Sequence, residues 1–248
     1  MKRRDLILAM IALLLIWQLI ASFVHLPILP SPVEVGRTFV HEILHGSLLE
    51  HFLASLWRVL ASTLLAILLA APTGLILGQS RRLNSIFSPA IYLLYPVPKV
   101  VLVPVVLLFF GIGNLPKIVL IFMILFFQIL VLVRDQAAGI RSELIQSVRS
   151  LGAGRRALFR FVYLPASLPA ILTALRQSVG TAVAVLYVAE LFATQRGLGY
   201  YIYFNASTLF DYPAMYAGIV ALSLMGLALY FGVDWLQHRL TPWQYIAG

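Results

Sequence analysis

Cysteine is absent from the 248 residues, which excludes disulfides and thiolate metal sites. Charged residues are scarce as well: they make up 11% of the chain, against about 25% in soluble domains. A GxxxxGK[ST] phosphate-binding loop is also missing from the sequence. What remains is 61% hydrophobic, with a mean hydropathy of +0.95. The composition therefore indicates a protein whose solvent is lipid.

Apolar stretches long enough to cross a bilayer, or nearly so, recur along the chain, and each needs roughly 20 residues to do so. Lipid offers no partner for backbone polar groups, so each stretch is predicted to be a helix. The predicted fold class is therefore all-α, a polytopic membrane protein with six transmembrane helices at 6–24, 57–79, 88–110, 117–133, 168–193 and 214–236.

The first stretch resembles a secretory signal, because an apolar run follows the basic start MKRRD. That run is 19 residues long, whereas a signal core has roughly 7–15 residues. No small-x-small cleavage site closes the run, and His25, Leu26 and Pro27 follow instead. We therefore expect the segment to be kept as a membrane helix.

Basic residues are unevenly shared between the two sets of alternating loops, and basic loops stay in the cytoplasm. With a cytoplasmic N-terminus, twelve basic residues fall inside and four outside, which predicts that both termini are cytoplasmic and explains the net charge of +9 without nucleic acid. The inner set is Lys2, Arg3, Arg4, Arg81, Arg82, Arg134, Arg141, Arg149, Arg155, Arg156, Arg160 and Arg239, and the outer set is Arg37, Arg58, Lys117 and Arg196.

The chain is predicted to divide into residues 1–56, the first membrane helix with an external helix, and residues 57–240, a five-helix core. Pro30-Ser31-Pro32 is a helix-start signal, and the following VEVGRTFVHEILH has apolar residues every fourth position. An amphipathic helix lying on the outer surface is therefore expected there. Ser47 and Glu50 match a capping box that opens the second span.

The third apolar stretch contains four prolines, namely Pro89, Pro96, Pro98 and Pro104. Proline removes a helical hydrogen bond and bends the helix. Two forms are compatible with this pattern: one long kinked helix, or a short interfacial segment over 86–95 followed by a span that starts near Pro98. Broken helices are tolerated in membranes where they line protein or a cavity, so the stretch is a pore-lining candidate.

The cytoplasmic loop 134–167 is predicted to hold two short helices. Ser142 is expected to cap the first, whose apolar face is Leu144, Ile145, Val148 and Leu151, and Gly152 is expected to end it. The second should run from Arg155 to Tyr163 and stop before Pro165. The first helix is too short to be stable alone, so it either packs on its own spans or docks into a groove of a partner.

In this loop the chain resembles the permeases of bacterial ABC importers, whose EAA motif has Glu-Ala-Ala, three residues, Gly, nine residues, a β-branched residue, one residue and Leu-Pro. Gly152, Val162, Leu164 and Pro165 stand at the matching offsets, whereas Gln146, Ser147 and Val148 replace Glu-Ala-Ala. The resemblance assigns these residues, together with Leu151, to the ATPase-coupling loop. Without the motif's acid, a specific salt bridge to the ATPase is not expected.

The resemblance covers nearly the whole chain. The segments LPSPVEV, PVPKVVLVPVVLLFFGIGNLPKI, AELFATQRGLGY and RLTPW look like the nitrate/sulfonate/taurine-type branch. It implies the type I importer permease fold in a bacterial cytoplasmic (inner) membrane, and a pore for a small anion such as a sulfonate, taurine or nitrate. It also implies a second permease subunit, expected to be a copy of this chain, two ATPase subunits and an extracytoplasmic solute-binding protein. The chain itself would be no enzyme and hold no cofactor or metal, since ATP and magnesium would bind to the ATPase.

Polar side chains inside spans are costly and usually face a cavity. By this rule the candidate translocation-path residues are Lys99, Gln128, Arg176, Gln177 and Glu190. Each has a structural alternative: Arg176 and Glu190 lie near span ends and could reach the membrane surface. A pore that favours anions is consistent with Lys99 and Arg176.

Three other functions compete with an anion importer. The first is a permease of the same family for an uncharged heterocycle such as a vitamin precursor. A secondary transporter would need coupling-ion sites, for which we find only Glu190 as a carboxylate within the spans. A metalloprotease is suggested by His41, Glu42 and His45, which fit HExxH with His51 downstream. The longer signature requires glycine where Leu48 stands, so three histidines on a solvated helix face are the expected arrangement.

Overall fold

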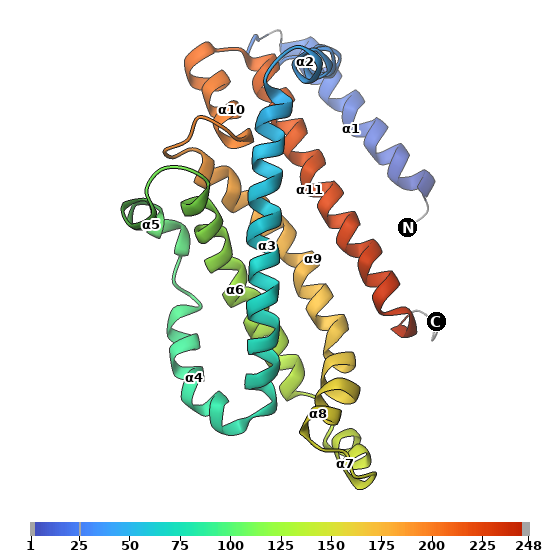
Figure 1. Cartoon of the computed structure of the whole chain (residues 1–248). Helices are drawn as coiled ribbons and strands as arrows, with labels where there is room; N and C mark the ends of the chain where they lie inside the picture. Colours follow the sequence, from blue (N-terminus) through green and yellow to red (C-terminus); the bar gives the residue numbers. More distant parts are fainter. Residues whose placement is uncertain (1–2, 25, 245–248) are drawn as a thin grey trace. The chain divides into compact units, whose positions relative to one another are not determined.

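The computed structural model describes residues 3–24 and 26–244, and this part of the chain is helical with no strand. The all-α fold class is therefore confirmed (Figure 1). In chain order the elements are α1 Arg3–Val24, α2 Pro32–Leu44, α3 Leu48–Gln79, α4 Arg81–Leu94, η1 Lys99–Leu102, α5 Val103–Phe110, α6 Asn114–Ala138, α7 Ser142–Ser150, α8 Arg155–Leu158, η2 Phe159–Tyr163, α9 Leu164–Glu190, α10 Leu198–Phe204, η3 Asn205–Leu209, α11 Tyr212–Leu240 and η4 Pro242–Gln244.

Four of the predicted spans are single helices that are long and apolar enough to cross a membrane: α3, α6, the continuous helix 155–190 and α11. α1 contributes a shorter apolar run, Leu8–Val24. The second span starts at Leu48, nine residues before the predicted 57, and directly after Ser47. Its first turns contain Glu50, His51 and Ser55, which interrupt the apolar run and lead hydropathy to place the start too late.

The third stretch is broken rather than one long kinked helix. α4 and the pair η1–α5 are bent by 76° at Tyr95–Pro98. η1 and α5 together have 12 residues, which is roughly 20 Å of helix and shorter than the 30 Å hydrocarbon layer. The prolines at positions 96 and 98 explain the break, because neither can donate a helical hydrogen bond.

The chain forms two compact units, and α3 and α11 contribute a segment to each. Unit 1 consists of Met1–Leu56 and Glu190–Leu224, and unit 2 consists of Trp57–Ala189 and Met225–Gly248. In unit 1, Ser31 caps α2 by accepting a hydrogen bond from the Glu34 backbone at 3.2 Å, as predicted. Val35, on the expected apolar face of α2, is buried.

In unit 2, α3 packs directly against the backbone of α6. A Cβ placed on Gly74 would lie 2.9 Å from the Leu130 carbonyl oxygen, and one on Gly78 would lie 2.6 Å from the Arg134 carbonyl oxygen. Small residues four apart allow such close approach between membrane helices. On α6, Leu125, Ile129 and Val133 are completely buried, so this contact forms the centre of the unit.

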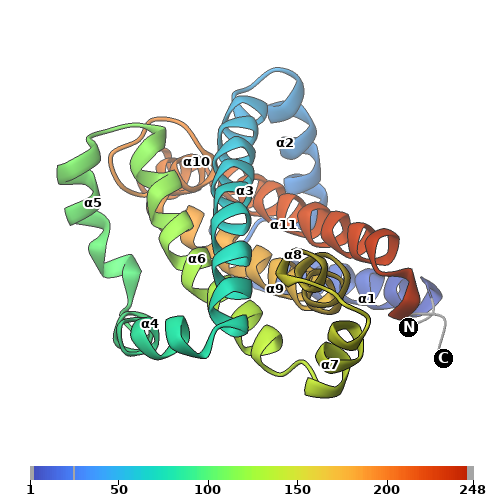
Figure 2. The same ribbon diagram turned by 60° about the horizontal axis from the view of Figure 1, so that its bottom comes forward.

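The second loop helix does not stop before Pro165, which corrects the prediction. α8 continues through the π-helical segment η2 into α9, and the backbone N–H of Leu164 donates to the carbonyl of Phe159, five residues earlier. The π-helical turn shifts the pattern of backbone hydrogen bonds by one residue, so the helix accommodates Pro165, which has no backbone N–H, without ending there. Figure 2 shows the resulting uninterrupted path from α8 into α9.

Residues 198–209 form a helical segment that sequence patterns did not indicate. They fold into α10 and the π-helical segment η3, which ends at Phe210 with a left-handed φ of 54°. Within unit 1, Gly218 of α11 allows close contact, since a Cβ there would lie 2.8 Å from side-chain atoms of Tyr201 and Ile202. The segment is too short and too aromatic to show a helical period.

Candidate functional site

The loop between α6 and α9 carries the predicted two-helix arrangement, although its start differs. Arg141, not Ser142, precedes the first helical residue and makes no side-chain cap, while the Ser142 hydroxyl donates to Glu143 at 3.3 Å. The end is as predicted: Gly152 has φ +83°. The backbone N–H of Gly152 donates to the Arg149 carbonyl at 2.9 Å and that of Ala153 to the Val148 carbonyl at 3.3 Å, which completes a Schellman motif.

The apolar face of α7 is only partly covered, because Ile145 and Val148 are half-buried and Leu144 and Leu151 are exposed. No residue of α7 is buried. Leu144 is 53% exposed and Leu151, directly after the helix, is 85% exposed. In Figures 1 and 2 α7 and α8 lie together where α9 begins, at the edge of unit 2. A nine-residue helix without a fully buried residue has the properties of a docking element.

The remaining motif positions are divided between surface and interior. Gln146 and Ser147 are exposed and Val148 is half-buried on α7. Val162 is buried in η2, where it anchors the second loop helix. Leu164 and Pro165 form the first turn of α9.

Lys99 lies at the break between α4 and η1, where it satisfies backbone carbonyls. Its ammonium group donates to the carbonyl oxygens of Leu94 at 2.8 Å, Tyr95 at 2.9 Å and Val97 at 3.2 Å. It also lies 4.7 Å from the centre of the Phe127 ring. The Leu94 carbonyl also accepts from the Val97 backbone at 3.3 Å. Carbonyls at a helix end lack further helical donors, so Lys99 has a structural function at the break.

Arg176 is paired within unit 2. Its guanidinium donates to the Asp234 carboxylate at 2.7 Å, linking α9 to α11. The two side chains are 28% and 30% exposed. Asp234 lies within the predicted span 214–236, so Glu190 is not the only carboxylate in the spans, and the sequence-based statement was wrong. The pair neutralises both charges.

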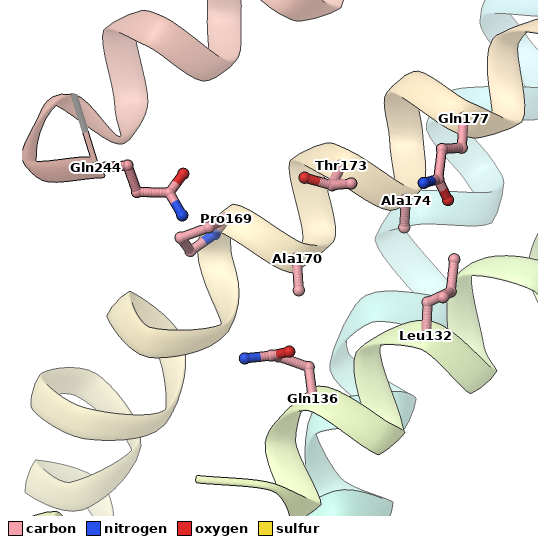
Figure 3. Close-up of a pocket in the computed structure, with 8 residues that line it drawn as sticks. All are labelled: Leu132, Gln136, Pro169, Ala170, Thr173, Ala174, Gln177 and Gln244. Carbon is pink, nitrogen blue, oxygen red and sulfur yellow. The ribbon is translucent and has the colours of Figure 1, made fainter. Parts of the chain in front are cut away.

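A cavity of about 340 Å³ opens in unit 2 between α6, α9 and η4 (Figure 3). Gln177, predicted as a path residue, lines it together with Gln136, Thr173 and Gln244. Leu132, Pro169, Ala170 and Ala174 complete the described lining, which carries no charged side chain. Gln128 is half-buried farther along α6 and does not line the cavity. The cavity offers only neutral donors and acceptors.

Glu190, the last residue of α9, is fully buried in unit 1 and binds polar groups there. Its carboxylate accepts hydrogen bonds from the Ser55 hydroxyl at 2.8 Å and from the Gly199 backbone at 2.9 Å. Ser55 in turn accepts from the Leu198 backbone at 2.8 Å. These bonds attach the loop after α9 to the first turns of α3. Ser55 gave no sequence signal, because its partners are more than 130 residues away.

The histidines are not all on the surface, which corrects the prediction. His41 and His45 are exposed on or beside α2, but His51 is buried and its Nδ1 accepts a hydrogen bond from the Gly197 backbone at 3.0 Å. Glu42 accepts a hydrogen bond from the Tyr201 hydroxyl at 3.0 Å. In the part of the chain that the structure describes, no three His, Asp or Glu side chains are grouped as a metal site.

Two further buried cations lie at the ends of predicted spans. Arg58 and Lys117, both predicted on the external side, are each 2% exposed within α3 and α6. Arg58 donates to the Asn114 side chain at 2.9 Å and so fixes the start of α6 against α3. Hydropathy cannot show that a basic residue at the edge of an apolar run is buried, because its burial depends on a partner that is distant in the sequence.

Long apolar helices, a broken span and a loop helix with an exposed apolar face together define a polytopic membrane protein of the transporter class. The family of binding-protein-dependent transport system inner membrane components matches residues 62–244. The taurine transport system permease protein TauC of Escherichia coli is 32% identical over 238 residues, covering 93% of this chain and 86% of TauC.

Two more relatives differ in what their names describe. The putative aliphatic sulfonates transport permease protein SsuC of Bacillus subtilis is 32% identical and covers 92% of this chain and 83% of SsuC. The formylaminopyrimidine transport permease protein ThiX of Halalkalibacterium halodurans is 28% identical, covering 94% of this chain and 92% of ThiX.

The fold agrees with that of a solved importer. A chain of the inward-facing MetNI methionine ABC transporter matches with a TM-score of 0.71 at 20% identity, covering 81% of this chain and 99% of that one. The chain belongs to the family of binding-protein-dependent transport system inner membrane components, the permease subunits of ABC importers. The predicted family and its type I permease fold are confirmed.

Proposed function

We propose that this chain forms, with a second copy of itself, the pore of an importer for a small sulfonate such as taurine in a bacterial inner membrane. The similarity to TauC and SsuC supports the substrate class. Two ATPase subunits would dock on the face formed by Leu144, Val148 and Leu151, and bind the ATP and magnesium that this chain does not. A solute-binding protein would deliver the solute from outside.

The observation that carries the proposal is the coupling helix, whose apolar face is only partly covered. α7 is held in a defined turn by Gly152, yet none of its residues is buried. Exposed leucines on an ordered helix favour a groove on another protein. A secondary transporter would have no use for such an element.

The neutral cavity between α6 and α9 suits an aminosulfonate. Glutamine amides donate to sulfonate oxygens and their carbonyls accept from an ammonium group. A pore must bind its solute weakly enough to release it, and uncharged partners meet this requirement. Lys99 and Arg176 do not define the selectivity in this proposal, because their charges are engaged by carbonyls and by Asp234.

Uptake in reconstituted vesicles tests the proposal. The chain is assembled with the ATPase and solute-binding protein of its importer, and uptake of labelled taurine is measured with ATP inside. Taurine uptake should require ATP and fall on Leu151→Asp, with less ATPase retained on the purified permease. Retention of full uptake by that variant contradicts the docking site.

A second candidate solute is an uncharged heterocycle, which the similarity to ThiX favours. Competition distinguishes the two. If the vesicles take up a labelled formylated aminopyrimidine and an excess of unlabelled taurine does not reduce that uptake, the substrate assignment is wrong, although the permease assignment stands.

A further inference from the structure

A second cavity in unit 2 lies between the turn that joins α3 to α4 and the loop helices. It has a volume of about 440 Å³. Gln79 and Ser80 contribute from the α3–α4 turn, Arg149 from the last turn of α7 and Arg155 from the first residue of α8. The remaining described lining is Ile76, Leu83, Leu158 and Tyr163. It is separate from the glutamine-lined cavity, with which it shares no residue.

The polar groups of this cavity are mostly hydrogen-bond donors. Each arginine carries five N–H donors and no acceptor. The amide nitrogen of Gln79 is buried without a hydrogen-bond partner. The Ser80 oxygen already accepts from the Leu83 backbone at 3.3 Å, so its proton is available to donate.

The charge of the cavity has one sign. Two guanidinium groups line it, and none of the described lining residues is acidic. Like charges that share a cavity repel, and an anion between them removes that repulsion. A buried amide donor without a partner is costly and calls for an acceptor at that position.

We infer that this cavity binds a phosphate-type oxyanion, held by Arg149, Arg155 and the Gln79 amide. Arginine pairs with phosphate oxygens through parallel N–H bonds. Two sources carry this group: the headgroup of an anionic lipid, or free inorganic phosphate. α3 and the continuous helix 155–190 are long and apolar enough to cross a membrane, and each has one end at this cavity. Basic pockets between such helices bind lipid headgroups.

An oxyanion in this position would connect the α3–α4 turn to both loop helices. Gln79 and Ser80 lie at the junction of α3 and α4, whereas Arg149 and Arg155 lie on either side of Gly152 in the coupling loop. The bound group would therefore hold the coupling element against the core. This inference does not depend on which solute the permease carries.

Melting of the purified full-length chain tests the site in two arms. In detergent, sodium phosphate is compared with sodium chloride at equal ionic strength. In lipid vesicles, phosphatidylcholine alone is compared with phosphatidylcholine plus phosphatidylglycerol. Stabilisation in the first arm identifies free phosphate, and stabilisation in the second alone identifies a lipid headgroup.

The double variant Arg149→Gln/Arg155→Gln should raise the anion concentration needed for half-maximal stabilisation by roughly tenfold or more, as expected for loss of charged hydrogen bonds. Arg156→Gln/Arg160→Gln is the matched control, because it removes the same charge from exposed positions outside the lining. Gln79→Leu keeps both arginines and should also weaken binding, so it serves if the double variant is unstable. Equal losses in the control pair, or no stabilisation in either arm, would overturn the site.

Discussion

Gly197 and Glu190 are in such close contact that a Cβ on the glycine would overlap the carboxyl carbon and both oxygens of the glutamate. Gly197 also has φ +127°, a backbone conformation that side chains rarely adopt. Only glycine can therefore stand where the loop after α9 passes over this buried carboxylate, which is bound to Ser55 and the Gly199 backbone.

Gly197→Ala is expected to destabilise the protein by more than backbone strain alone. The new methyl group must displace the Glu190 carboxylate, whose hydrogen bonds are worth about 1.5–3 kcal/mol each as charged bonds. Gly113→Ala is the control, because Gly113 has φ +130° but no atom within 4 Å of a Cβ. Thermal melting in detergent should rank Gly197→Ala well below Gly113→Ala. Equal melting temperatures would mean that the contact with Glu190 contributes nothing.

The raised pKa of the Tyr201 hydroxyl leads us to expect a loss of folding stability at alkaline pH. Burial, and secondly the charge and hydrogen bond of Glu42, raise the pKa of Tyr201 above its usual 10.0. The folded state then keeps a proton that the unfolded state releases, so this stability is fully present below pH 10.0 and declines as pH rises above it. The slope should approach about 1.4 kcal/mol per pH unit.

Melting temperatures of the wild type and Tyr201→Phe between pH 9 and 11, roughly one unit either side of the ordinary tyrosine pKa, measure this effect. The wild type should lose stability more steeply than the variant, because phenylalanine has no proton to lose. Tyr203→Phe is a matched control at an exposed position of the same helix. Parallel curves for wild type and Tyr201→Phe would rule out the linkage.

Gly78→Ala tests the contact between α3 and α6. The methyl group of the alanine would overlap the Arg134 carbonyl oxygen and the Ala137 side chain. Such overpacking destabilises a protein by about 1–3 kcal/mol. Gly180→Ala is the control, because it lies in a membrane helix with no atom within 4 Å of a Cβ. There, alanine should stabilise the helix by about 0.5–1 kcal/mol. Detergent melting curves that move the two variants in the same direction would contradict the packing argument.

Gly152→Ser tests the turn that ends the coupling helix. Serine in a left-handed conformation costs about 1–2 kcal/mol, enough to lower the population of the native turn several-fold. Gly154→Ser adds the same side chain where φ is −76° and serine is a favoured cap. The measurement is ATP-dependent uptake together with the yield of co-purified ATPase. Gly152→Ser should reduce both and Gly154→Ser neither; full activity in Gly152→Ser would show that the turn is not required for coupling.

Features that depend on neighbouring residues could be predicted from the sequence. The Ser31 cap, the left-handed Gly152 and the break after Tyr95 each follow from a short local pattern. The same is true of the long apolar helices, because lipid leaves the backbone no other way to satisfy its polar groups.

Features that depend on distant partners could not. His51 was expected on a solvated face, but it bonds the Gly197 backbone, and nothing in the sequence indicated that Arg58 bonds Asn114. Asp234 was overlooked until Arg176 was found beside it. Gly74 and Gly78 are four residues apart, a spacing that indicates close packing of two helices. Only the structure shows that α6 is the partner.

The continuity of α8, η2 and α9 has a mechanical consequence. Residues 155–190 form one helix of 36 residues, a rod of roughly 54 Å. Because the helix is continuous, a displacement of Arg155 is passed through the π-helical turn of η2 into α9. α7 lies on the other side of the hydrogen-bonded Gly152–Ala153 turn, so a movement of α7 reaches this long helix through that turn.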